Sequence, residues 1–172
     1  MEKKTQPPDP KKVHVMPADV RAGQVISLVE VTGGLGSNID ASRLADELGA
    51  NVAVMIPILD TAELLGLVKS ERGNVALTDL GLRFQKTSRE KVRLLRDILA
   101  KIEPFKTAVE LANRYGEVTT TQVSRALMER GIHWHHDPEL NESLVRTLLI
   151  HWAIYAGLLT YNKSGNFESM KR

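Results

Sequence analysis

The chain has 172 residues, of which 42% are hydrophobic and 26% are charged, and its formal net charge is +2 at pH 7. One or two small domains of this length can bury a core, and the lack of cysteine excludes a disulfide framework and a thiolate metal site. The polar, proline-rich start has no signal-peptide pattern, and no apolar run is long enough to span a bilayer. We therefore expect a cytoplasmic protein that is not inserted into a membrane.

Residues 1–17 combine four prolines with four lysines. Such a composition buries too little apolar surface to fold, so we expect a flexible tail. Residues 18–31 have one broad apolar face and are predicted to form a helix. Residues 32–38 contain three glycines, but they lack the Lys-Ser/Thr pair of a phosphate-binding loop and the glycine spacing of a dinucleotide loop. We interpret them as a flexible connector.

Residues 40–84 predict a helix, a turn, a second helix, two short strands around a charged tip, and the start of another helix. Asp40 and Asn51 are suited to cap the two helices. Val54, Ile58, Leu59, Ala62 and Leu65 give the second helix its apolar spacing. The predicted strands lie at 67–68 and 75–77, and Thr78 or Asp79 caps the last helix. This order of elements is that of a winged helix-turn-helix.

The region after this unit predicts one or two long helices over residues 83–115. Ser88 is suited to cap the first of them, and Pro104 to start the next. The apolar stripe of these helices packs either on the protein's own core or against a second subunit.

The pattern then repeats. Threonines 119–121 cap a helix that ends at Gly131, Asn141 opens a further helix, and residues 159–167 read as strand, turn and strand.

We therefore predict a mainly α fold with small β-wings, built of two winged helix-turn-helix units joined by a helical linker. The predicted segments are a flexible tail (1–17), the first unit (18–87), the linker (88–116) and a second, winged-helix-like unit (117–172).

The second helix of the first unit is poorly suited to reading DNA bases. A recognition helix presents polar and basic residues to the major groove. Residues 51–66 contain no Lys or Arg, and Asp60 and Glu63 would repel phosphates. Pro57 removes a backbone donor inside this helix and is expected to kink it. Packing or protein interaction is the favoured role, with Ile56, Asp60 and Glu63 as candidate interaction residues.

Basic residues gather elsewhere, where they could contact phosphates without reading sequence. The candidates for such a DNA contact are Lys69, Arg72, Arg89, Arg93 and Arg96. A solvated helix face of mixed charge is the favoured interpretation, because several carboxylates lie among these cations.

The segment from His133 to Asp137 resembles a metal site only weakly. His133, His135 and His136 are candidate zinc ligands, but structural zinc requires four ligands on a rigid scaffold, and this segment reads as a loop between helices. We interpret it as an exposed connector with Trp134 tucked onto the core, and we assign neither a metal nor another cofactor. No cysteine nucleophile, Gly-x-Ser-x-Gly motif or recognisable carboxylate pair occurs, so no enzyme activity is expected.

Three runs of sequence carry a family resemblance: MPADVRAGQVISLVEVTGGLGSNIDASRLADELGANV, PILDTAELLGLV and VALTDLGLRF. They resemble the AAA-associated C-terminal domain that follows the ATPase domain in some prokaryotic ATP-binding proteins of nitrate/sulfonate/bicarbonate-type ABC transporters. The likeness is close over 16–84 and looser over 152–161.

The resemblance implies an accessory or regulatory module rather than an enzyme, with no catalytic residues to carry over. The chain has no Walker A glycine-lysine pair and no ABC signature motif. We expect a freestanding relative acting in trans, favoured slightly by the methionine start, with a fragment of a longer protein as the alternative.

The leading hypothesis is a protein-interaction module that presents residues 51–66, or its wings, to a transporter ATPase or to a second copy of the chain. The alternative is a winged-helix DNA-binding transcriptional regulator, which would need a dimer to align two basic surfaces.

Overall fold

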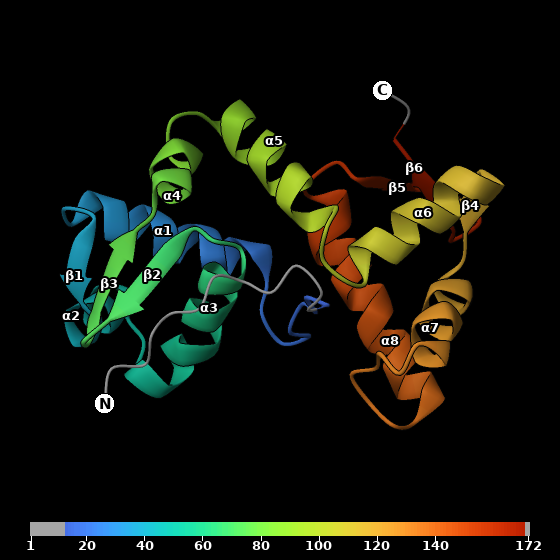
Figure 1. Cartoon of the computed structure of the whole chain (residues 1–172), viewed down its shortest axis with the longest axis horizontal. Helices are drawn as coiled ribbons and strands as arrows, with labels where there is room; N and C mark the ends of the chain where they lie inside the picture. The colour runs from blue at the N-terminus through green and yellow to red at the C-terminus, as the bar shows by residue number, and fades with distance from the viewer. Residues whose placement is uncertain (1–12, 171–172) are drawn as a thin grey trace.

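The computed structural model describes residues 13–170 and arranges them as two halves connected by a long helix (Figure 1). It is mainly helical with two small antiparallel sheets, as the sequence predicted. Residues 1–12 of the predicted tail lie outside the described residues.

The first half contains three helices and a three-stranded sheet in the order β1-β3-β2. Its elements are α1 (Ala22–Gly34), β1 (Asn38–Asp40), α2 (Ala41–Glu47), α3 (Val52–Leu64), β2 (Val68–Glu71) and β3 (Asn74–Leu77). The last strand lies in the middle of the sheet, where it pairs with both neighbours.

The helix starts of this half follow from short polar side chains. The Asp40 carboxylate accepts the backbone N–H groups of Ser42 and Arg43 at 2.9 and 3.2 Å. Asn51 caps α3 in the same way, and the Thr78 hydroxyl caps the helix after the sheet. Each cap satisfies a donor that the helix leaves unpaired, which confirms the predicted starts.

Two helices lead from the first half to the second. They are α4 (Asp79–Phe84) and α5 (Ser88–Leu99). Thr87 rather than Ser88 caps α5, because its hydroxyl accepts the N–H of Glu90. In Figure 1, α5 runs diagonally between the halves and meets the second half beside the start of its first helix.

The second half repeats the order of the first. It contains α6 (Phe105–Tyr115), β4 (Glu117–Val118), α7 (Thr120–Glu129), α8 (Pro138–Leu148), a π-helical segment η1 (Leu149–Ile154), β5 (Leu159–Tyr161) and β6 (Phe167–Ser169). Its sheet order is β4-β6-β5, so the last strand is again central.

The third helix of each half ends in the same way. Gly66 and Gly157 have φ values of 72° and 66°, which L side chains rarely adopt. The following N–H groups, of Leu67 and Leu158, turn back to the carbonyls of Ala62 and Ala153 at 3.0 and 2.8 Å. This glycine-dependent helix end turns the chain into the hairpin.

The core is one continuous hydrophobic cluster that extends through both halves. Its largest fully buried side chains include Trp152, Phe84, Phe105 and Phe167. Among the described residues, no helix is long and apolar enough to cross a membrane.

Three predicted boundaries near the start of the chain were wrong. The first helix begins at Ala22 and continues through Gly34, beyond the predicted range of 18–31. The supposed connector of 32–38 runs into β1, which begins at Asn38, because the backbone of residues 38–40 pairs with β3. The predicted tail of 1–17 also extended too far, since Met16 is fully buried and Val15 pairs with Glu103.

One boundary in the second half was also wrong. The helix predicted to open at Asn141 begins at Pro138, where the Asp137 carboxylate accepts two backbone N–H groups. Asn141 itself is fully buried within the helix and donates its amide to Ser124 at 3.0 Å. A buried polar side chain requires such a partner, and sequence spacing alone gave no sign of it.

Candidate functional site

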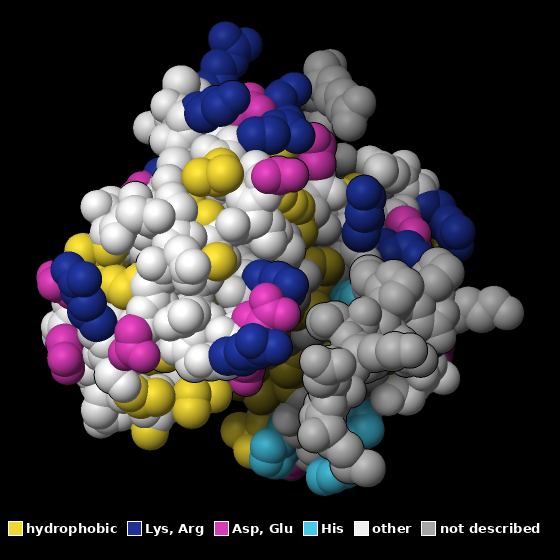
Figure 2. Space-filling view, turned by 60° about the vertical axis from the view of Figure 1, so that its left-hand side comes forward, with side chains coloured by type: hydrophobic (Ala, Val, Ile, Leu, Met, Phe, Trp, Pro, Cys, Tyr) yellow, Lys and Arg dark blue, Asp and Glu magenta, His cyan; other side chains and the backbone are white. Residues whose placement is uncertain are grey.

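The outer surface of α3 carries the clearest unpartnered feature of the first half. Met55 and Ala62 are buried against the core, whereas Val52, Val54 and Ile56 are 40%, 55% and 47% exposed. We call Val52, Val54 and Ile56, together with exposed Asp60 and Glu63, the α3 patch. In Figure 1, α3 lies at the lower edge of the first half, and hydrophobic side chains gather at that edge of the molecule in Figure 2.

The patch is ordered along the helix. Val52 and Ile56 occupy the first turns, and Asp60 and Glu63 follow on the same side at helical spacing, whereas Val54 is exposed on another side of the first turns. The helix is continuous through Pro57, and the hydroxyl of Thr61 donates to the Pro57 carbonyl at 2.8 Å. The result is a rigid surface with an apolar region followed by an acidic region.

The two carboxylates of the patch differ in their surroundings. Glu63 accepts the backbone N–H of Ser70, which ties α3 to β2. Asp60 is exposed, and neither a side-chain hydrogen bond nor an ion pair holds it among the described residues. Asp60 is therefore the acid of this surface that a partner could engage directly.

Sequence reasoning placed Ile56, Asp60 and Glu63 at this surface but assigned Val54 to the packed face. The spacing of Val54 with Ile58 and Ala62 fits a helix stripe, yet the first turn of α3 extends beyond the core. Only the tertiary structure shows that the core does not cover the first turn of α3. Hydrophobic periodicity identifies the apolar face of a helix but not how far along the helix other elements pack on that face.

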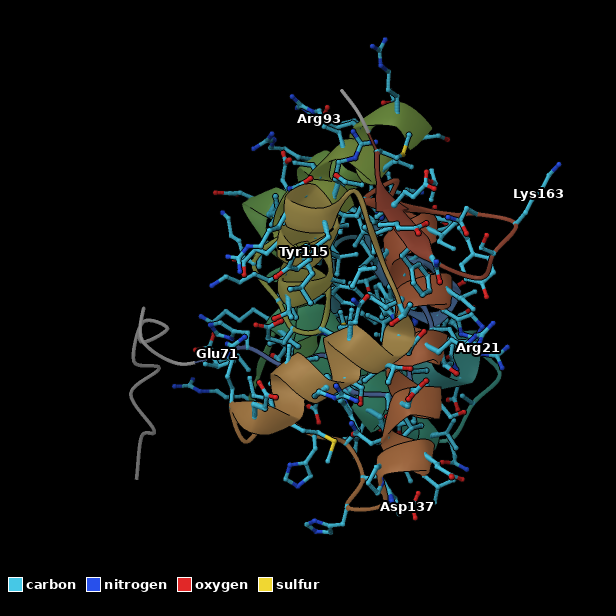
Figure 3. The ribbon with its side chains drawn as sticks, turned by 90° about the vertical axis from the view of Figure 1, so that its right-hand side faces the viewer. Arg21, Glu71, Arg93, Tyr115, Asp137 and Lys163 are labelled. Atoms are coloured by element: carbon cyan, nitrogen blue, oxygen red, sulfur yellow. The ribbon has the colours of Figure 1, made fainter. Side chains whose placement is uncertain are left out.

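The candidate phosphate-binding cations do not form one surface. Lys69 lies beside Glu71 at 3.3 Å, and Arg72 sits at the tip of the first hairpin with a φ of 53°. Arg93 pairs with Glu90 at 2.7 Å. Figure 3 shows Glu71 of the first hairpin on the opposite side of the molecule from Lys163 of the second.

Arg96 has a structural partner. Its Nε donates to the carbonyl of Ala156 at 3.0 Å, which links α5 to the end of η1. It also lines a hollow of about 560 Å³ between α5, α6 and β6, together with Asn113, Gly157 and Ser169. Of the five candidate cations, Arg72 and Arg89 are exposed and have no ion-pair partner among the described residues.

An ion-pair cluster joins α4 to α5. Glu90 lies between Arg93 and Arg83, at 2.7 and 3.3 Å. The hydrogen bond from Arg93, with its positive charge and that of Arg83, holds the pKa of the Glu90 carboxyl below its ordinary value. The same pairing raises the pKa of Arg93. These arginines are partly neutralised within the molecule, which weakens their use as phosphate contacts.

The three histidines before α8 do not converge on one point. The rings of His133 and His136 lie 4.9 Å apart and are tilted, while His135 Nδ1 accepts the N–H of Asp137 at 3.0 Å. No group of three or more His, Cys, Asp or Glu residues that could hold a metal ion occurs within residues 13–170. Trp134 is half-buried against the core, as predicted.

The comparisons with known proteins identify the family. A model of the C-terminal AAA-associated domain matches residues 42–162. The chain therefore belongs to this family, and the match extends from α2 of the first half into the second hairpin. No curated protein and no solved structure matched the chain.

Proposed function

We propose that this chain is a non-catalytic accessory module that binds another protein through the α3 patch. In this proposal, residues 18–87 and 117–172 are two winged-helix units, joined by residues 88–116. The single observation that carries the proposal is the exposure of Val52, Val54 and Ile56 on a helix without a single cation.

The winged-helix assignment is supported by the repeated topology. In the first half, a helix, a short strand and two further helices precede a hairpin whose second strand is central in the sheet. Residues 117–172 repeat the strand, the two helices and the hairpin, and the helix ahead of them, α6, belongs to the joining segment 88–116. The third helix of such a unit is the one that DNA-binding members insert into the major groove. Here α3 occupies that position with apolar and acidic residues.

Binding of a protein is favoured over binding of DNA by the chemistry of this surface. Exposed apolar side chains gain free energy when a partner removes them from water, at roughly 25 cal/mol per Å². A phosphate backbone offers them no such gain and is repelled by Asp60 and Glu63. A partner with apolar anchors and nearby cations would satisfy both regions of the patch.

The family membership suggests an ABC-type ATPase as the partner. Members resembling this chain follow the ATPase domain in ATP-binding proteins of nitrate/sulfonate/bicarbonate-type transporters, and a freestanding copy would contact such a subunit in trans. That partner works at the cytoplasmic face of the membrane, so the proposal places this protein in the cytoplasm. A second copy of the chain is the other partner that the patch could accept.

Isothermal titration of the protein with a purified ATP-binding subunit of this transporter type tests the proposal. We expect saturable binding, weakened at least about 30-fold by Ile56→Lys, because a charge in the centre of an apolar interface is costly. The matched control is Leu140→Lys on α8, a residue that is 53% exposed. Equal loss in both variants, or no binding by the wild type, would contradict the proposal.

Sedimentation equilibrium separates the two partners. A homodimer formed through the patch would dissociate in the Ile56→Lys variant. A wild type that remains monomeric would leave only the heterologous partner.

DNA binding is the second candidate, and it rests on exposed Arg72 and Arg89. Fluorescence anisotropy of a labelled mixed-sequence duplex at low and physiological salt tests it. Binding that persists at physiological salt and weakens in Arg72→Ala and Arg89→Ala would favour the DNA-binding alternative. We expect no such binding, because few free cations are present and salt screens weak phosphate contacts.

A further inference from the structure

The segment ahead of α1 is held by the second half of the molecule, although it leads directly into the first. We call residues Val13–Val20 the strap. The N–H of Glu103 donates to the carbonyl of His14, and the N–H of Met16 donates to the carbonyl of Glu103, both at 2.9 Å. Met16 is fully buried between these contacts. Figure 1 shows the strap in the middle of the molecule, between the halves.

Both tryptophans of the chain bind the strap. The indole Nε1 of Trp134 donates to the carbonyl of Met16 at 2.6 Å, and that of Trp152 donates to the carbonyl of Val20 at 2.9 Å. Trp134 precedes α8 and Trp152 lies in η1, so the two donors come from different segments of the second half. Buried indole N–H groups require an acceptor, and here the strap backbone supplies both.

The second half fixes these contact groups independently of the strap. The backbone N–H groups of Trp134 and His135 donate to the buried Asn141 side chain at 2.7 and 3.2 Å. The carboxylate of Glu103, which is 2% exposed, accepts from Arg130 at 3.0 Å and from the N–H of Thr107 at 3.1 Å. The strap therefore lies against a preorganised surface.

Apart from the hydrophobic cluster that both halves share, few contacts set their orientation. The helices and sheets of each half pack chiefly against one another, and α4 and α5 form the main covalent and packed connection. Arg96, through its bond to Ala156, is a second tie. The strap is a third, because it continues at Ala22 into α1, which packs on α2, α3 and β3.

We propose that the strap is a releasable latch: an extended segment bound in cis by Glu103, Trp134 and Trp152 that holds the second half in a fixed orientation to the first. A few hydrogen bonds and the buried side chains of Met16 and Val20 can open locally while the rest of each half stays folded. A partner that pulls on the chain ahead of Val13 would then free the halves to move relative to one another.

The test uses the full chain with spin labels on Cys introduced at Ser42 and Ser143, two exposed residues, one in each half. The protein has no native cysteine, so labelling is specific. The latch is weakened by Trp134→Phe, which keeps an aromatic side chain but removes the donor, and separately by Met16→Ala. Tyr155→Phe is the control, since Tyr155 is exposed and makes no hydrogen bond to the strap among the described residues.

The proposal makes two linked expectations. Amide hydrogen exchange at Met16 and Glu103 should be about tenfold faster in the latch variants, as expected for loss of one stabilising contact. The distance distribution between the labels should broaden in the same variants and stay narrow in the control. Circular dichroism should show unchanged helix content.

Three results would overturn the proposal. Faster exchange with an unchanged distance distribution would mean that the strap does not set the orientation of the halves. Unchanged exchange in both variants would mean that Trp134 and Met16 do not hold it. Broadening in Tyr155→Phe as well would mean that the halves move for another reason.

Discussion

The two halves share one topology but present different surfaces on their third helices. In the first half, the opening turns of α3 expose Val52, Val54 and Ile56. In the second, the exposed positions of α8 are mostly polar or charged and include Glu139, Ser143 and Arg146, with Leu140 as the apolar exception. The shared order of elements therefore does not imply a shared role.

The halves also differ in what their third helices do inside the molecule. The third helix of the second half continues through the π-helical η1, which positions Trp152 to bind the strap. Such π-helical insertions often occur at functional positions. The first half has a regular α3 and an open outer surface. In the two proposals above, one half therefore serves internal coupling and the other external contact.

The largest expected effect tests whether the halves depend on one another. Trp152→Ala removes a fully buried side chain and should lower the free energy of unfolding by about 3–5 kcal/mol. Urea denaturation measures the loss, and hydrogen exchange locates it. We expect protection to fall first in α7 and α8, with α1 and β3 affected less. Uniform loss across both halves would show a single cooperative unit.

A matched pair of glycine substitutions compares the helix ends. Gly66→Ala and Gly157→Ala should each cost about 1–2 kcal/mol, because both positions have positive φ. At Gly66 an added Cβ would meet only Leu80, at 3.8 Å, whereas at Gly157 it would lie 2.9 Å from Arg96 Nη2. Gly157→Ala should therefore be the more destabilising in urea denaturation. Equal losses would mean that Arg96 moves aside freely.

The N-caps of the third helices give a smaller contrast. Asn51→Ala and Asp137→Ala should each cost about 1 kcal/mol. Asp137 accepts two backbone N–H groups, at 3.0 and 2.9 Å, whereas Asn51 accepts one at 2.9 Å, and only Asp137 carries a negative charge at a helix N-terminus. Thermal unfolding should rank Asp137→Ala as the more harmful. The reverse order would mean that contacts around each cap, rather than its hydrogen bonds and charge, set the loss of stability.

Substitutions on the exposed surfaces of α3 and α8 should distinguish an effect on partner binding from an effect on stability. Ile56→Lys and Leu140→Lys should each change the free energy of unfolding by no more than about 0.5 kcal/mol, because both side chains are half-exposed. Only Ile56→Lys should weaken binding of a protein partner. A large loss of stability in Ile56→Lys would mean that the patch supports the fold rather than a partner.

The smallest expected effect concerns the joint between α4 and α5. The pKa of Glu90 is lowered in the folded protein, so its pairing with Arg93 contributes stability above the unfolded pKa, and this is lost as the pH falls through the folded value. In the Glu90→Gln variant, the free energy of unfolding should therefore fall slightly less steeply as the pH is lowered into the acid range. Carboxyl NMR titration of Glu90 should give a midpoint below the usual value of about 4.3. A midpoint above it would contradict the ion pair.

Local chemistry in the sequence determined much of this fold. Asp40, Asn51 and Thr78 cap helices as predicted, and Gly66 ends the third helix. These signals act over a few residues. Few residue types can accept the free backbone N–H groups at a helix start, and few can adopt the left-handed conformation at a helix end. The sequence also predicted a repeated order of helix, turn, helix and hairpin, but it assigned α6 of the second half to the linker. The mainly helical class with small sheets followed from hydrophobic spacing.

Only the tertiary structure decided the parts that depend on distant residues. Trp134 and Met16 are 118 positions apart, and Trp152 and Val20 are 132 apart, so no local pattern connects them. The exposure of Val54, the burial of Asn141 and the pairing of β1 with β3 likewise depend on which surface covers which. The sequence shows which side chains are hydrophobic or polar and therefore tend to be buried or to need a hydrogen-bond partner. Which residue each one contacts is decided only when the chain packs.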